Sequence, residues 1–227
     1  MLPLRDDISS RRTPYINYAL IAINILVYIW QLQVGQADPR QVYAFALIPA
    51  QVTIGLTPDD FLHVLTSMFM HGGLAHIGGN MLYLWIFGDN VEDAMGHGRY
   101  LLFYLFGGIV ASAAHIISSP LSQIPTVGAS GAIAAVLGAY LVLFPNARVL
   151  TLVSLGFFIR LTMVPSIIVL GLWFILQLFQ GVLTLGGPDV GGVAFWAHIG
   201  GFLVGLALAR ILARNRTYAG YARWRTF

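Results

Sequence analysis

Apolar residues along this chain gather into six long runs that polar segments separate. The runs cover Tyr15 to Leu32, Leu74 to Phe87, Tyr100 to Ile117, Gly128 to Phe144, Leu161 to Leu185 and Val193 to Leu212. A helix of about 20 apolar residues crosses the hydrocarbon core of a bilayer. The pattern therefore predicts an all-α polytopic membrane protein, a six transmembrane helix bundle that occupies residues 15–212. Residues 1–14 and a basic tail at residues 213–227 are expected to lie outside the bilayer.

The composition agrees with a membrane protein. Of the 227 residues, 58% are hydrophobic and 9% are charged, whereas a soluble domain carries roughly 25% charged residues. Cysteine is absent, which excludes disulfides, thiolate metal sites and a cysteine nucleophile. The net charge of +3 comes from arginine, since the chain has no lysine. In so apolar a chain the arginines indicate topology rather than nucleic-acid binding.

The arginines also predict the orientation. With six spans the two termini share a side, and all of the 12 arginines except Arg40 fall on that side. Positive residues concentrate in cytoplasmic segments, so we expect a multi-pass protein of the cell membrane (plasma or inner) with both termini cytoplasmic. The long outer segment from Gln33 to Thr66 overlaps apolar stretches at Val42–Val52 and Phe61–Met70, which predict interfacial helices.

Three of the predicted spans carry polar residues near their outward ends. Ser130 opens the fourth span within Gly-Ala-Ser-Gly-Ala at 128–132, His198 lies in the sixth, and His76 and Asn80 lie four residues apart in the second. A serine between small residues is open to a substrate and to a base, as a nucleophile must be. Ionisable side chains inside membrane helices are rare and usually functional. Because these residues share one depth on one side, we favour a single site.

Helical spacing indicates how the halves of this site meet. Ser130, Ala134 and Gly138 form one stripe of the fourth span, and His198, Gly201 and Gly205 form one stripe of the sixth. Small residues let helix backbones approach closely, which would bring the Ser130 hydroxyl within reach of the His198 ring. Each feature also has a structural interpretation: a packing face, a core histidine with a backbone partner, and interhelical hydrogen bonds from His76 and Asn80.

No metal or other cofactor is expected. The predicted spans contain no Asp or Glu, and no His-Glu-x-x-His pair occurs. Of the other histidines, His71 is expected to be structural, His115 to have no obvious partner, and His63 and His97 to be solvated in loops. A small transporter, whose ion coupling usually needs an intramembrane acid, is the weaker alternative.

Several motifs together resemble those of the rhomboid intramembrane serine proteases. They are Gly-Ala-Ser-Gly-Ala at 128–132, Ala-His-x-x-Gly-x-x-x-Gly at 197–205, His76-x-x-x-Asn80 and Gly88-x-x-x-Glu92-x-x-x-Gly96, in that family's order along all six spans. The resemblance implies a rhomboid-like bundle in which Ser130 is the nucleophile and His198 the general base of a dyad. It implies an oxyanion hole from Asn80, His76 and the Ser130 backbone N–H. Glu92 would be a structural cap between the cytoplasmic ends of spans two and three.

The resemblance further implies that the substrates are single-pass transmembrane proteins, cleaved near the outer membrane face. One departure concerns Ala134, where many members have an aromatic residue that stacks on the histidine, so another group must hold the ring. Another is the region Phe61-Leu62-His63-Val64, which stands where the first outer loop of many members carries a Trp-Arg pair. A catalytically silent relative that binds membrane clients is the main alternative.

The fifth predicted span differs from its neighbours in bulk. It carries Trp173, Phe174 and Phe179, whereas the second, fourth and sixth spans are rich in glycine. Bulky helices pack less closely in lipid. We therefore expect this span and the turn from Gly186 to Gly192 to form a lateral gate for the substrate.

Overall fold

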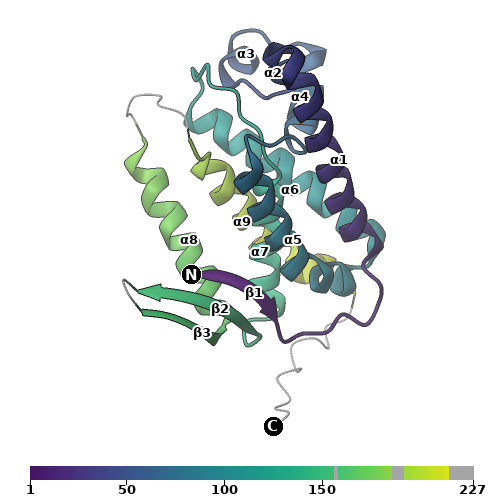
Figure 1. The fold of residues 1–227 in the computed structure, drawn as a ribbon, viewed down its shortest axis with the longest axis vertical. Coiled ribbons are helices and arrows are strands. Elements are labelled where there is room, and N and C mark those ends of the chain that lie inside the picture. The colour runs from purple at the N-terminus through teal and green to yellow at the C-terminus, as the bar shows by residue number, and fades with distance from the viewer. Residues whose placement is uncertain (156–157, 186–191, 215–227) are drawn as a thin grey trace.

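The computed structural model describes residues 1–155, 158–185 and 192–214. Its described helices are α1 (Tyr15–Ala37), α2 (Pro39–Tyr43), α3 (Pro49–Ile54), α4 (Pro58–Ser67), α5 (Leu74–Met95), α6 (His97–Ser118), α7 (Ser130–Leu143), α8 (Ser166–Leu183) and α9 (Phe195–Leu212). Figure 1 shows the long helices as a bundle with α7 and α9 inside it, and α2, α3 and α4 at one end. Of the basic tail, only residues 213 and 214 lie within the described ranges.

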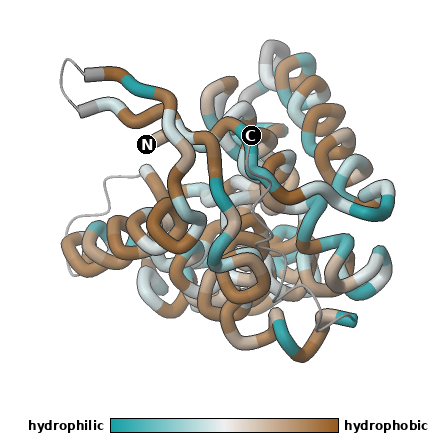
Figure 2. Tube along the Cα trace, turned by 90° about the horizontal axis from the view of Figure 1, so that it is seen from below, coloured by the Kyte–Doolittle hydropathy of each residue, from teal (hydrophilic) through white to brown (hydrophobic). Residues whose placement is uncertain are grey.

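Four described helices are long and apolar enough to cross a membrane: α1, α6, α8 and α9. Helix α7 is apolar but has 14 residues, and the 22-residue α5 carries Asp89, Glu92 and Asp93 near its C-terminal end. Figure 2 shows hydrophobic residues along most of the helices. The protein is therefore embedded in a membrane by several helices, and the count of six spans stays a prediction.

Helix α7 forms the centre of the core. Most of its residues are buried, and its most extensive packing is against α9. A Cβ atom at Gly138 would meet the backbone of Phe202, and one at Gly205 would meet the backbone of Ala135 and Ala139. Backbones this close tolerate only glycine at the contact. The small residues of both helices therefore serve as a packing face.

A three-stranded antiparallel sheet shows that the all-α expectation was wrong. Its order is β1 (Leu2–Asp6), β2 (Arg148–Leu155), β3 (Phe158–Pro165). Figure 1 shows it at the opposite end of the bundle from α2, α3 and α4. Val149 and Thr151 are fully buried, which fits the two-residue period of a strand. The fifth apolar run began at Leu161, but Pro165 separates its strand part from α8.

The second apolar run ended at Phe87, but the helix that contains this run extends beyond it. Helix α5 continues to Met95, and α6 begins at His97 after Gly96, whose φ of 81° favours glycine. The helix can continue through its acidic residues because their side chains accept hydrogen bonds from groups outside it. Asp93 accepts a hydrogen bond from the backbone N–H of Arg11, for example.

The segment between α1 and α5 contains three short helices, α2, α3 and α4, which cover the apolar stretches only in part. Thr57 and Asp60 form a capping box at the start of α4. Their hydrogen bonds lower the pKa of Asp60. The turn expected from Gly186 to Gly192 lies outside the described residues except for Gly192.

Candidate functional site

The first residue of α7 and the first turn of α9 lie in contact. Ser130 Oγ is 2.7 Å from His198 Nε2, and His198 is 8% exposed. Close packing explains this distance, because a Cβ at Gly201 would collide with the carbonyl oxygen of Gly131, the neighbour of Ser130. The structure thus brings together the two residues that the helical stripes were expected to join.

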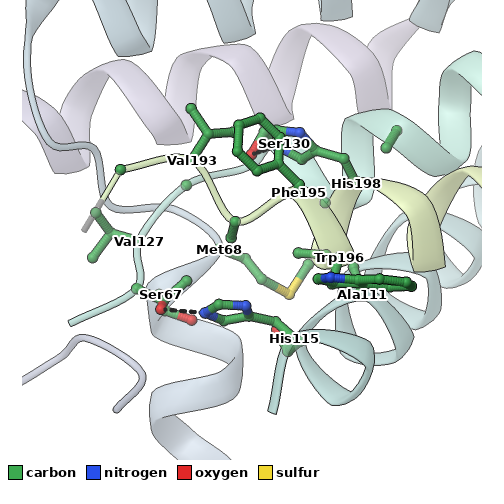
Figure 3. A pocket seen from close by; sticks show the side chains of 18 of the residues that line it. Ser67, Met68, Ala111, His115, Val127, Ser130, Val193, Phe195, Trp196 and His198 are labelled. Atoms are coloured by element: carbon green, nitrogen blue, oxygen red, sulfur yellow. Dashed lines mark hydrogen bonds between the residues drawn. The ribbon is translucent and has the colours of Figure 1, made fainter. Parts of the chain in front are cut away.

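A cavity of about 1170 Å³ opens onto this pair. Its wall includes Ser130, His198, His76 and Asn80, and much of the rest comes from the segment between α6 and α7. Figure 3 shows Ser130 and His198 side by side, with Phe195 and Val193 next to them. The cavity gives a peptide or water access to the serine hydroxyl.

Asn80 and His76 present hydrogen-bond donors to the same cavity from α5. Asn80 is 8% exposed, and its Nδ2 has no hydrogen-bond partner among the described residues. The Gly72 backbone N–H donates to His76 Nδ1 at 3.3 Å, so the proton of the neutral ring resides on Nε2. Both side chains therefore have a donor available for a ligand.

Gly128 allows the segment before Ser130 to pass close to the His76 ring. A Cβ at this position would lie 2.9 Å from His76 Cε1 and Nε2, and the φ of 138° is one that side chains rarely adopt. The His71 ring lies 5.2 Å from the His76 ring. Burial, followed by the proximity of His76, lowers the pKa of His71 to about 4, so the His71 ring is neutral at pH 7.

Two residues of α8 hold the other side of His198. Gln177 Oε1 is 2.7 Å from His198 Nδ1, and the Trp173 ring lies 5.8 Å from the imidazole with a 35° angle between the planes. Trp173 thus contacts the His198 ring, as we expected an aromatic residue at position 134 to do in other members. Ala134 itself is fully buried between helices. Neither residue was predicted to contact His198, although a glutamine in a long apolar run was a visible signal.

The Gly88, Glu92 and Gly96 motif lies at the far end of α5. A Cβ at Gly88 would collide with the Asn17 side chain, and buried Glu92 accepts hydrogen bonds from the backbone N–H groups of Ile16 (3.0 Å) and Asn17 (2.7 Å). His97 Nδ1 lies 2.5 Å from the same carboxylate. Glu92 therefore joins the start of α1 to α5 and α6. We expected it to connect only the second and third spans, which are α5 and α6.

The remaining histidines include two corrections. His97 contacts Glu92 and is not simply solvated, and His115 Nε2 has a partner in Thr126 Oγ1 at 3.0 Å. Within the described ranges, no group of three or more histidine or carboxylate side chains has the arrangement of a metal site.

These features define a class: a membrane-embedded helical protein whose cavity exposes a hydrogen-bonded serine and histidine. The sequence profile of the Rhomboid domain matches residues 58–215. The chain belongs to the rhomboid family.

Similar proteins carry names from this family. The chain is 32% identical over 200 residues to the rhomboid protease GluP of Bacillus subtilis, a match that covers 88% of this chain and 35% of GluP. It is 33% identical over 95 residues to the putative rhomboid protease YdcA of the same organism, covering 41% and 47%. The human mitochondrial presenilin-associated rhomboid-like protein is 29% identical over 132 residues, covering 57% and 33%. The chain thus spans less than half of the length of each relative.

Proposed function

We propose that this protein is an intramembrane serine endopeptidase that cleaves single-pass transmembrane proteins near the outer membrane face. The observation that carries the proposal is the 2.7 Å hydrogen bond between Ser130 Oγ and His198 Nε2 at the wall of a large cavity. A nucleophile within hydrogen-bond reach of a base, which is itself oriented by a third group, is the geometry of nucleophilic catalysis. The names of GluP and YdcA support the same activity.

The chemistry begins with attack on the scissile peptide. Ser130 Oγ bonds to the carbonyl carbon while its proton moves to His198 Nε2. The carbonyl oxygen becomes an oxyanion, which accepts hydrogen bonds from Asn80 Nδ2, His76 Nε2 and the Ser130 backbone N–H. That N–H is free of intrahelical bonding because Ser130 is the first residue of α7. Neutral donors avoid burying a charge, and each is worth about 3 kcal/mol in other serine hydrolases.

The intermediate then breaks its C–N bond, and His198 returns the proton from Nε2 to the departing amine. Water enters through the cavity and gives up a proton to the same nitrogen as it attacks the acyl-serine. Release of Ser130 Oγ with that proton restores the resting pair. A substrate helix has to unwind locally before it reaches the serine, since its amides are hydrogen-bonded within the helix. Helices weakened by glycine or proline should therefore be preferred.

The same proposal includes the topology. Six spans, α1 and α5 through α9, would form a domain over residues 15–212 in the cell membrane. Residues 1–14, the sheet and the tail at 213–227 would face the cytoplasm. The positions of Arg5 in β1 and of Arg148 and Arg160 in β2 and β3 support this orientation, with Arg40 in α2 at the opposite end.

The test is cleavage of a reporter transmembrane helix in liposomes. Ser130→Ala and His198→Ala should each abolish cleavage, and the double variant should be no worse, because the two residues act as a unit. Ser154→Ala, at an exposed position on β2, is the control and should cleave normally. Cleavage by Ser130→Ala at the wild-type rate would refute the assignment. Absence of cleavage by the folded wild-type protein across such helices would favour a catalytically silent client-binding protein.

A further inference from the structure

Helix α8 carries two glutamines that face different surroundings. Gln180 is exposed on the outer surface of the helix, whereas Gln177 is half-buried. Gln177 shares its face with buried Leu170, buried Gly181 and half-buried Trp173 and Phe174, residues spaced by three and four along the helix. This face packs against α9. A primary amide within a membrane helix is costly unless it has a partner, and the partner of Gln177 is His198.

The contact determines which nitrogen of His198 carries the proton. An amide oxygen 2.7 Å from Nδ1 accepts a hydrogen bond, so the proton of the neutral ring resides on Nδ1. The lone pair then lies on Nε2, which is 2.7 Å from Ser130 Oγ and needs that lone pair to accept the hydroxyl proton. The opposite tautomer would present N–H to the serine and could not act as its base.

The contact also fixes the orientation of the ring. Trp173 packs against the imidazole from the same helix, one turn before Gln177. Trp173 lines the cavity, but Gln177 is absent from the described residues that do so. The amide thus lies behind the histidine, where it contacts the base and no substrate.

We propose that Gln177 is a positioning residue for the Ser130–His198 pair, and that His198 is a competent base only while α8 is packed on α9. This inference rests on the proposed protease function and adds to it a dependence of the chemistry on α8. The group that orients the base is the neutral amide of Gln177. It comes from α8, whereas the serine comes from α7 and the histidine from α9. It stabilises the working tautomer without burying a carboxylate.

The packing between α8 and α9 shows what would be lost if α8 moved outward. The Phe174 and Phe202 rings stack at 4.5 Å, and Trp196 Nε1 donates to the Gly181 carbonyl oxygen at 3.0 Å. A displacement of α8 that breaks these contacts also removes Gln177 from Nδ1. If a substrate enters past α8, the helix has to return before proton transfer. Entry and attack would then be separate states of one helix.

The first test replaces the amide by a side chain of similar shape that has no oxygen. Gln177→Met should lower kcat on the reporter helix on the order of 10- to 100-fold, part of what a general base contributes, with little change in KM. Reaction of Ser130 with a small fluorophosphonate should slow by the same factor. Gln180→Met, on the exposed side of α8, is the matched control and should behave as wild type.

A conservative replacement separates positioning from packing. Gln177→Glu keeps an acceptor oxygen next to Nδ1, so it should retain turnover where Gln177→Met loses it. Equal losses in both variants, or a Gln177→Met protein that folds and reacts with the probe as fast as wild type, would overturn the inference. Failure of the wild-type protein to react at Ser130 would instead overturn the proposed function.

The dependence on α8 can be tested by locking that helix in place. A Cβ at Gly181 would lie 3.5 Å from the Cβ of Phe195, which is within the range that a disulfide spans. The chain has no cysteine to compete. In the Gly181→Cys, Phe195→Cys protein, the oxidised form should react with the fluorophosphonate at least as fast as the reduced form. Slower reaction after oxidation would contradict the requirement that α8 be packed on α9.

Discussion

The close contact between α7 and α9 makes Gly201→Ala an informative perturbation. The new Cβ would fall against the Gly131 carbonyl oxygen, well inside the 3.0 Å that real Cβ atoms keep. The two helices would have to separate by about 1 Å to admit it, at a cost of about 1–3 kcal/mol in stability. The same separation would stretch the 2.7 Å contact between Ser130 Oγ and His198 Nε2 beyond hydrogen-bond reach. A misplacement of about 1 Å lowers turnover on the order of 100-fold.

The assay measures turnover of the reporter helix per folded protein, together with the unfolding temperature. In Gly205→Ala the new Cβ would meet the backbone of Ala135, one helical turn farther from the site. This variant should lose a similar amount of stability as Gly201→Ala but less turnover. At Gly171 on α8 a new Cβ would meet no described atom within 4 Å beyond the backbone of its own helix, so Gly171→Ala should lower neither quantity. A folded Gly201→Ala protein with wild-type turnover would refute the link between this packing and the geometry of the site.

Three further predictions concern Asn80, Glu92 and Asp6. Asn80→Ala should lower kcat on the order of 10- to 1,000-fold without unfolding the protein. The reason is that Asn80 Nδ2 has no hydrogen-bond partner to lose among the described residues. Unfolding of the variant in detergent would show that Asn80 is structural. Glu92→Gln should destabilise the protein by about 2–3 kcal/mol and leave turnover of the folded fraction unchanged. The reason is that the carboxylate accepts hydrogen bonds from the start of α1, at the far end of α5 from the site. Lost turnover with unchanged stability would contradict this prediction. Burial, assisted by neighbouring carboxylates, raises the pKa of Asp6 from 3.8 to about 7, so the folded state holds a proton that the unfolded chain releases. Stability should therefore fall as pH rises from 3.8 to about 7, and Asp6→Asn should flatten this slope in thermal unfolding; an identical slope in the variant would show that another group is responsible.

The pairing of Ser130 with His198 could be predicted because it depends on local spacing. Small residues three and four positions apart mark the face on which two membrane helices meet. Once α7 and α9 meet on those faces, residues at the same depth are neighbours. The glycines at 138, 201 and 205 each meet backbone atoms of the opposing helix, which is the contact that the stripes predicted.

The contact from Gln177 could not be predicted in the same way. Helix α8 is apolar on nearly all sides, so its sequence leaves open which face turns toward α9. Only the packed positions of Trp173, Phe174 and Gln177 reveal that rotation. The family resemblance therefore implied that a residue other than Ala134 holds the ring, without indicating which one.

The sheet was missed for a different reason. Strand β1 lies about 140 residues before its partner, as the Asp7 to Arg148 hydrogen bond illustrates, and no local pattern encodes such a pairing. Strand β3 merges with α8 into one apolar run in which Pro165 is the boundary. The extension of α5 was missed because partners from the N-terminal segment, such as the backbone of Arg11, satisfy its acidic residues.

The most direct test of the central claim is labelling with a fluorophosphonate, followed by mass spectrometry to locate the modified residue. The account predicts one adduct, on Ser130, in the wild-type protein in detergent or liposomes. Ser130→Ala should lose the adduct because the nucleophile is gone, and His198→Ala should lose it because the base 2.7 Å away is gone. An adduct on another serine, or labelling of Ser130 at an unchanged rate in His198→Ala, would contradict the claim that these two residues form one catalytic pair.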